Sequence, residues 1–143
     1  MIVGWKVIFS LRSDLATDAV AMAIYSRSPN PDELVHHNDA GVQYLSLRYS
    51  DRLEEAGITP SVGSKGDSYD NAPAETVNKL YKTEMVYRSK PFEGVDGFEW
   101  ATFLYVDWYN NRRIHESIGM ITPAELERNY YAQLSLGNKL VPK

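Results

Sequence analysis

The sequence predicts an α/β fold, in which helices pack on a small sheet. Short apolar and β-branched segments at residues 2–9, 34–37 and 58–62 have the composition and length of strands. Segments with helical periodicity, at residues 14–25 and 43–56, separate them. Alternating strands and helices of this kind are typical of layered α/β domains.

The two helices of the N-terminal half have recognisable ends. Ser13 or Asp14 is a suitable N-cap for the first helix, because either side chain can accept a hydrogen bond from an amide of the first turn. Two prolines within residues 28–31 then interrupt the helical pattern. The second helix, over residues 43–56, is expected to end at Gly57, since glycine readily adopts the left-handed conformation that closes helices.

The third predicted helix follows a glycine-rich loop. Asp70 or Asn71 would cap it, and Pro73 would fall in its first turn, where the missing N–H of proline breaks no hydrogen bond. The helix then runs to about residue 88. This start places Glu75 in the first turn, near the positive end of the helix dipole, which favours a carboxylate.

The C-terminal third is expected to contain two more helices. Residues 95–109 are dense in tryptophan and tyrosine, which indicates a buried aromatic cluster rather than a platform for stacking bases. Thr122 and Pro123 start a final short helix. We therefore expect one domain over residues 1–131 and a loose tail over residues 132–143.

Composition excludes several classes of protein. With 143 residues, of which 43% are hydrophobic, the chain can form one domain with a core and is unlike a disordered segment. The absence of cysteine excludes disulfide frameworks and thiolate metal sites. No apolar run approaches membrane-spanning length, so we expect a cytoplasmic protein without membrane contact.

The net charge of −4 is unusual for a protein that binds DNA, but charge acts locally. Residues 76–92 carry four cations against a single carboxylate. This segment forms either a basic patch within an acidic whole or a solvated helix face, and charge alone does not separate the two readings.

Two carboxylates stand in distinct motifs that are rich in turn residues. Asp39 follows a predicted strand, and Glu75 opens a predicted helix. The ends of strands in open α/β sheets are where ligands collect, and carboxylate oxygens suit Mg²⁺. The alternative is a turn residue for Asp39 and a capping residue for Glu75. The motifs themselves are His36-His37-Asn38-Asp39-Ala40-Gly41-Val42-Gln43-Tyr44 and Gly66-Asp67-Ser68-Tyr69-Asp70-Asn71-Ala72-Pro73-Ala74-Glu75.

These motifs, together with residues 2–5, 105–115 and 122–125, resemble the catalytic core of insertion-sequence transposases of the IS-three group. Those are DDE enzymes similar to retroviral integrases. The resemblance implies an RNase H-like (integrase catalytic core) fold, of which this chain would be the C-terminal two-thirds. An incomplete sheet lacking the first two strands, and a missing first Asp of the triad, would follow. Residues 2–9 would then be an unpaired strand, in a marginally stable monomer.

The same resemblance implies roles for individual residues. Asp39 and Glu75 would be catalytic and would bind Mg²⁺ or Mn²⁺, of which the complete enzyme holds two ions. Lys82, two helical turns after Glu75, would contact DNA near the scissile phosphate, and Lys79 is a second candidate. Either lysine could instead be a solvated surface charge.

Four further residues are candidates for DNA contact: Asn71, Arg112, Arg113 and His115. Guanidinium groups suit phosphate, although cations at the end of a helix also match its dipole. The adjacent His36 and His37 point to opposite faces of a strand, so we expect one in the core and no zinc site.

The function implied by the resemblance is metal-dependent DNA strand cleavage and strand transfer, which is DNA transposition. Its partners would be insertion-sequence ends, target DNA, and a second copy of the chain or the full-length transposase. Without the first Asp, we expect the chain alone to have severely reduced activity. Two alternatives remain open: a non-catalytic transposase remnant, and an RNase H-like nuclease acting on RNA–DNA hybrids.

Overall fold

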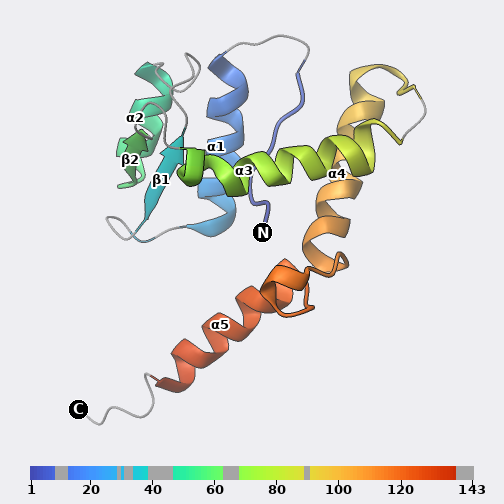
Figure 1. The fold of residues 1–143 in the computed structure, drawn as a ribbon. Helices are drawn as coiled ribbons and strands as arrows, with labels where there is room; N and C mark the ends of the chain where they lie inside the picture. The colour runs from blue at the N-terminus through green and yellow to red at the C-terminus, as the bar shows by residue number, and fades with distance from the viewer. Residues whose placement is uncertain are drawn as a thin grey trace. The chain divides into compact units, whose positions relative to one another are not determined.

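A computed structural model describes residues 1–8, 13–28, 30, 34–38, 47–62, 68–88 and 91–137 (Figure 1). The chain divides into two compact units. The central unit comprises Val3–Ala101, and the C-terminal unit comprises Met1–Ile2 with Thr102–Lys143. Among the described residues, no helix combines the length and the apolar content that a membrane span requires.

The elements follow the order that the sequence predicts, apart from the first strand. Those of the central unit are α1 (Ser13–Arg27), β1 (Val35–Asn38), α2 (Leu47–Glu55), β2 (Thr59–Val62), α3 (Ser68–Tyr81) and the π-helical segment η2 (Lys82–Val86). α4 (Gly94–Asn111) begins in the central unit and ends in the C-terminal unit, where η3 (Glu116–Ile118) and α5 (Pro123–Gly137) follow.

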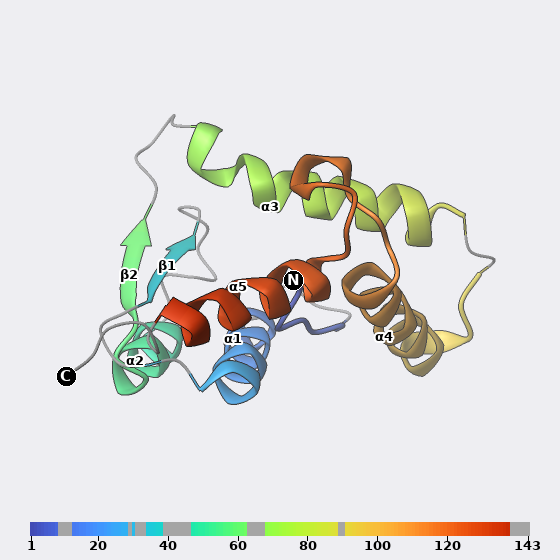
Figure 2. The same ribbon diagram turned by 90° about the horizontal axis from the view of Figure 1, so that it is seen from below.

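The strands β1 and β2 lie side by side and parallel, with Val35 opposite Thr59 and Asn38 opposite Val62 (Figure 2). Parallel strands need a crossover connection, and α2 lies within it. α2 also contacts β2, and α3 contacts β1. The predicted α/β organisation is therefore confirmed in the central unit.

Side chains from α1 and α2 form the core of the central unit. α1 contributes Val20, with Ala16 and Ile24 packed beside it, because residues four apart share one face of a helix. α2 contributes Tyr49 and Leu53, which are 2% and 1% exposed. This core also includes Ile58, which leads into β2.

The predicted end of α2 at Gly57 is confirmed. Gly57 has a φ of 64°, the left-handed conformation that glycine adopts without a steric penalty. The Ile58 amide then donates to the Leu53 carbonyl over 2.9 Å, which satisfies a carbonyl at the end of the helix. This turn sends the chain directly into β2.

The prediction of a strand over residues 2–9 is wrong for the described residues 1–8, which adopt neither strand nor helix. In the described part of the chain only β1 and β2 form a sheet, so this segment has no ladder partner. It packs on α1 instead. Ser26 Oγ donates to the Val3 carbonyl over 3.2 Å, and Gly4 lies so close to α1 that a Cβ would stand 2.1 Å from the Ala19 carbonyl oxygen.

The predicted start of the third helix is also wrong. α3 begins at Ser68, so Pro73 lies inside the helix and Glu75 lies in its third turn. Proline cannot donate to the carbonyl four residues earlier, yet the helix continues through it. Because the helix dipole acts mainly on charges in the first turn, it does not stabilise the Glu75 carboxylate in the third turn. The helix widens after Tyr81 into the π segment η2.

In the C-terminal unit, the second half of α4 buries Thr102, Tyr105 and Tyr109. The expected aromatic core is therefore formed by tyrosines, whereas Trp108 is 39% exposed. α5 begins where predicted, with Thr122 Oγ1 accepting from the Glu125 amide over 3.2 Å. α5 continues to Gly137, beyond residue 131, and the division expected there stays a prediction.

Candidate functional site

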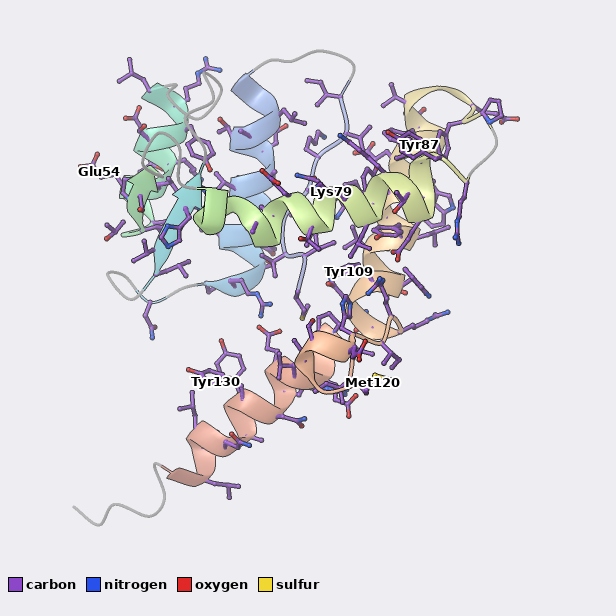
Figure 3. All side chains as sticks on the ribbon, in the orientation of Figure 1. Glu54, Lys79, Tyr87, Tyr109, Met120 and Tyr130 are labelled. Carbon is purple, nitrogen blue, oxygen red and sulfur yellow. The ribbon has the colours of Figure 1, made fainter. Side chains whose placement is uncertain are left out.

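The first part of the candidate site is the exposed side of α3, where Glu75 and Lys79 are brought together. Lys79 Nζ lies 3.7 Å from Glu75 Oε2, with side chains that are 77% and 59% exposed. They stand four residues apart, which places neighbours on one helix face (Lys79 is labelled in Figure 3). A surface ion pair of this kind is weak, so the carboxylate remains accessible to another cation.

Lys82 is the first residue of η2 and is exposed. It follows Glu75 by seven residues, so two helical turns return it to the side of α3 that carries Glu75 and Lys79. The next residue, Thr83, is held to the helix because its Oγ1 donates to the Lys79 carbonyl over 2.9 Å. Glu75 and the two lysines that follow it, Lys79 and Lys82, thus lie on one side of the helical surface.

Asp39 and the side chain of Asn71 lie outside the described residues. Asp39 directly follows Asn38, the last residue of β1, and α3 contacts that strand. The structure therefore brings the helix of Glu75 against the strand that leads to Asp39. Among the described residues there is no group of three or more histidines and carboxylates that could hold a metal ion.

His36 and His37 lie on opposite faces of β1, as predicted. His36 is half-buried, its Nε2 is hydrogen-bonded to the Tyr49 hydroxyl, and the two rings lie 5.7 Å apart. Burial lowers the pKa of His36, and the neighbouring His37 lowers it further. The half-buried His36 ring is therefore favoured in its neutral form. His37, by contrast, is exposed.

Arg112, Arg113 and His115 lie in the C-terminal unit, just after α4. Arg112 is exposed, and its Nη2 lies 3.8 Å from Asp107 Oδ2. Arg113 instead places its Nη1 2.9 Å from His115 Nδ1 and its guanidinium carbon 5.7 Å from the centre of the Tyr109 ring. The structure therefore brings Arg113 and His115 together, against Tyr109.

Asn110 is a polar residue that sequence reasoning considered only as part of the run of residues 110–115 suited to phosphate contacts, with no role in the fold. It is 6% exposed, and its side-chain amide exchanges two hydrogen bonds of 2.8 Å with the backbone of Ile2. Its partner is more than a hundred residues away, so no local pattern could reveal the pairing. The only available signal was its place beside Tyr109 on the buried side of α4.

Comparison with known proteins gives relatives over most of the chain. Residues 56–123 match the family model of the integrase core domain. The chain is 46% identical over 136 residues to the transposase of insertion sequence element IS986/IS6110 of Mycobacterium tuberculosis, covering 92% of this chain and 49% of that protein. It is 49% identical over 137 residues to the transposase of IS629 of Shigella sonnei, covering 96% and 45%.

A more distant relative is transposase InsF of insertion sequence IS3A of Escherichia coli, 30% identical over 132 residues, covering 92% of this chain and 45% of that protein. The chain thus spans about half the length of the curated relatives it matches.

Among solved structures, the catalytic core domain of BIV integrase aligns with 90% of this chain and 80% of its own, at a TM-score of 0.64 and 22% identity. This match confirms the predicted integrase-core, RNase H-like fold.

Proposed function

Because the chain is similar to insertion-sequence transposases over most of its length, and residues 56–123 match the integrase core domain, we propose that it belongs to these transposases and supplies part of a DNA strand-transfer site. One observation carries this proposal. The exposed carboxylate of Glu75 stands on a helix that contacts β1, and β1 runs directly into Asp39. Glu75 thus stands on a helix that contacts the strand preceding Asp39 in the sequence, which supports the proposal.

Asp39 and Glu75 are the proposed ligands of Mg²⁺ or Mn²⁺. Carboxylate oxygens are the donors that these ions prefer, and among the described residues Glu75 Oε2 forms an ion pair with a surface lysine, Lys79, over 3.7 Å. A divalent ion held there would supply Lewis-acid polarisation of a phosphodiester oxygen. These are two of the three carboxylates of a DDE site, so the proposal includes impaired strand transfer by the chain alone.

Lys82 and Lys79 are the proposed contacts to the DNA backbone beside that carboxylate. Both are exposed and share one side of the helical surface with Glu75. Lys79 is partly neutralised by its ion pair, so Lys82 is the stronger candidate. Asn71, one turn before Glu75 on the same helix, and the exposed Arg112 are proposed as further contacts.

A metal-binding measurement tests the proposal. Mn²⁺ is titrated into the 143-residue chain and followed by electron paramagnetic resonance, for the wild type, Glu75→Gln and Glu54→Gln. Glu54 is the matched control, because it is an exposed glutamate on α2 (labelled in Figure 3). We expect Glu75→Gln to weaken Mn²⁺ binding about tenfold or more, because losing even a hydrogen-bond partner of a metal ligand typically costs about 10–100-fold in metal affinity. Equal affinity in all three proteins would remove Glu75 from the site.

A nucleic-acid assay tests the reaction itself. The chain is incubated with Mn²⁺ and a duplex carrying an insertion-sequence end with a free 3′-hydroxyl, and in parallel with an RNA–DNA hybrid. Joining of the duplex, even weak, that is abolished by Glu75→Gln supports strand transfer. Cleavage of the hybrid without any joining favours the nuclease alternative.

A further inference from the structure

Four buried or half-buried side chains at or just after the end of α4 contact one another or Ile2. This α4 corner consists of Tyr109, Asn110, Arg113 and His115. We infer that Asn110 and Arg113 are positioning residues, and that Arg113 does not contact DNA. Through the α4 corner, Asn110 fixes the N-terminal backbone, and Arg113 orients His115 and with it the connection to α5.

Asn110 acts as a one-residue substitute for a neighbouring strand. Its Oδ1 accepts from the Ile2 amide and its Nδ2 donates to the Ile2 carbonyl, both over 2.8 Å. Only a side-chain amide carries a donor and an acceptor in one plane, so aspartate could not make both bonds. A buried amide without these partners would keep the full free-energy cost of its desolvation. The pairing therefore determines that Ile2, and no other residue of the N-terminal segment, lies beside Asn110.

Arg113 acts through the His115 ring. Its Nη1 lies 2.9 Å from His115 Nδ1 and 3.4 Å from Nε2. Because a guanidinium nitrogen can only donate, the shorter contact favours the tautomer that accepts at Nδ1 and carries its proton on Nε2. The His115 ring stands edge-on to Tyr109, with centroids 4.8 Å apart, and the guanidinium lies over the same tyrosine ring. The Arg113 guanidinium thus contacts the rings of both His115 and Tyr109.

The backbone of His115 carries this order into α5. His115 donates to the Ile121 carbonyl over 3.1 Å, and its own carbonyl accepts from Met120 over 2.9 Å. Thr122, which directly follows Ile121, is the N-cap of α5. Rotation of the His115 ring would therefore disturb the short connection that determines where α5 begins.

The intervening residues face the other way. Asn111 and Arg112 are exposed, and both contact Asp107: Asn111 Nδ2 donates to Oδ1 over 2.9 Å, and Arg112 Nη2 lies 3.8 Å from Oδ2. Within the Asn-Asn-Arg-Arg run, the first and fourth residues thus serve the fold, while the second and third face solvent. Asn111 can therefore serve as the matched control for Asn110, and Arg112 as the matched control for Arg113.

The test compares Asn110→Ala with Asn111→Ala, and Arg113→Gln with Arg112→Gln, in the 143-residue chain. We expect Asn110→Ala and Arg113→Gln to lower the melting temperature by about 3 °C or more, and the two controls to lower it by less than about 1 °C. Asn110→Ala should also speed hydrogen exchange of the Ile2 amide at least tenfold, because its acceptor is lost. Unchanged exchange at Ile2 would overturn the role of Asn110.

For Arg113, the decisive readout is the ¹⁵N spectrum of His115. In the wild type we expect the tautomer with the proton on Nε2, and in Arg113→Gln a mixture of both. Arg113→Lys, which keeps the charge but not the planar guanidinium, decides the matter if Arg113→Gln does not fold: the tautomer signature should still change, and a wild-type tautomer would contradict the positioning role. In Arg113→Gln, a wild-type tautomer together with a shallower salt dependence of DNA binding would make Arg113 a DNA contact. None of these readouts requires Asp39 or Glu75, so they are independent of the proposed metal site.

Discussion

At the scale of the residue, the His36–Tyr49 pair shows how burial sets protonation. The ring of His36 is half-buried, and its Nε2 is bonded to a buried tyrosine hydroxyl. Desolvation by burial, with a smaller contribution from His37, lowers the pKa of His36 below its ordinary value of 6.5. The folded protein therefore favours the neutral ring, whereas the unfolded chain takes up a proton at about pH 6.5.

The free energy of unfolding should consequently fall as the pH falls below about 6.5, because the unfolded state binds the additional proton. We expect His36→Gln, which keeps an acceptor for Tyr49, to lose less stability between pH 7.5 and 5.5 than the wild type. The difference should be below about 1 kcal/mol, since the half-exposed ring is screened by solvent. Urea unfolding at both pH values measures it, and the exposed His37→Gln should remove only the smaller, coulombic contribution to the lowered pKa of His36. Identical losses in wild type and His36→Gln would contradict the argument.

Lys82 carries a second prediction at this scale. If it neutralises one DNA phosphate, Lys82→Gln should reduce the slope of log affinity against log salt by about 0.9. Lys6→Gln is the control, because Lys6 is a half-exposed lysine whose Nζ lies 3.7 Å from Glu99 on α4. Fluorescence anisotropy with one duplex over a series of salt concentrations gives both slopes. An unchanged slope for Lys82→Gln would assign this lysine to the solvated surface.

At the scale of the element, the ends of helices can be predicted from the sequence where they depend on a few neighbouring residues. The stop of α2 at Gly57 and the start of α5 at Thr122 could be predicted, since caps depend on a few adjacent residues. The state of residues 1–8 could not, because a strand requires a partner elsewhere in the chain. The start of α3 was missed for a related reason: proline is favoured in the first turn but does not compel a helix to begin there.

The N-terminal segment yields the prediction that belongs to this scale. Gly4→Ala would place a Cβ 2.1 Å from the Ala19 carbonyl oxygen and 2.9 Å from Ala23 Cβ, so the segment must move off α1. We expect a loss of about 1–3 kcal/mol in the free energy of unfolding. Gly97→Ala is the matched control, because its Cβ would meet Glu93 Cβ at 3.6 Å and the Phe92 carbonyl carbon at 4.0 Å, which are ordinary contacts, and alanine favours the helix interior. Equal stability of the two variants would show that Gly4 is not in close contact with α1.

At the scale of the whole molecule, the α/β class and the similarity to insertion-sequence transposases could be predicted from the order of motifs, because such sequence blocks persist even where the local structure differs from expectation. The candidate site could be read only in part. Glu75 and Lys79 were identified from sequence and do lie together, whereas the role of Asn110 in the fold was not, because it depends on Ile2 at the other end of the chain. Side chains that act within one helix are visible in sequence, and those that join distant segments are not.

Each unit contains buried side chains of its own, and this leads to a prediction for the molecule as a whole. Leu53, 1% exposed, belongs to the core of the central unit, whereas Tyr109, 7% exposed, belongs to the C-terminal unit. Leu53→Ala creates a cavity and should destabilise its unit by about 2–5 kcal/mol. We expect hydrogen exchange to accelerate in α1 and α2 more than in α5, because local opening follows the contacts of each unit.

Tyr109→Leu is the reciprocal variant, and it should accelerate exchange in α5 more than in α1 and α2. Hydrogen–deuterium exchange read by mass spectrometry on peptides from each helix compares the two variants directly. The backbone of α4 passes from one unit into the other without a break, so some transmission through this helix is expected. Uniform acceleration across all helices in both variants would instead mean that the chain unfolds as one cooperative body, in which the two units stabilise each other through α4.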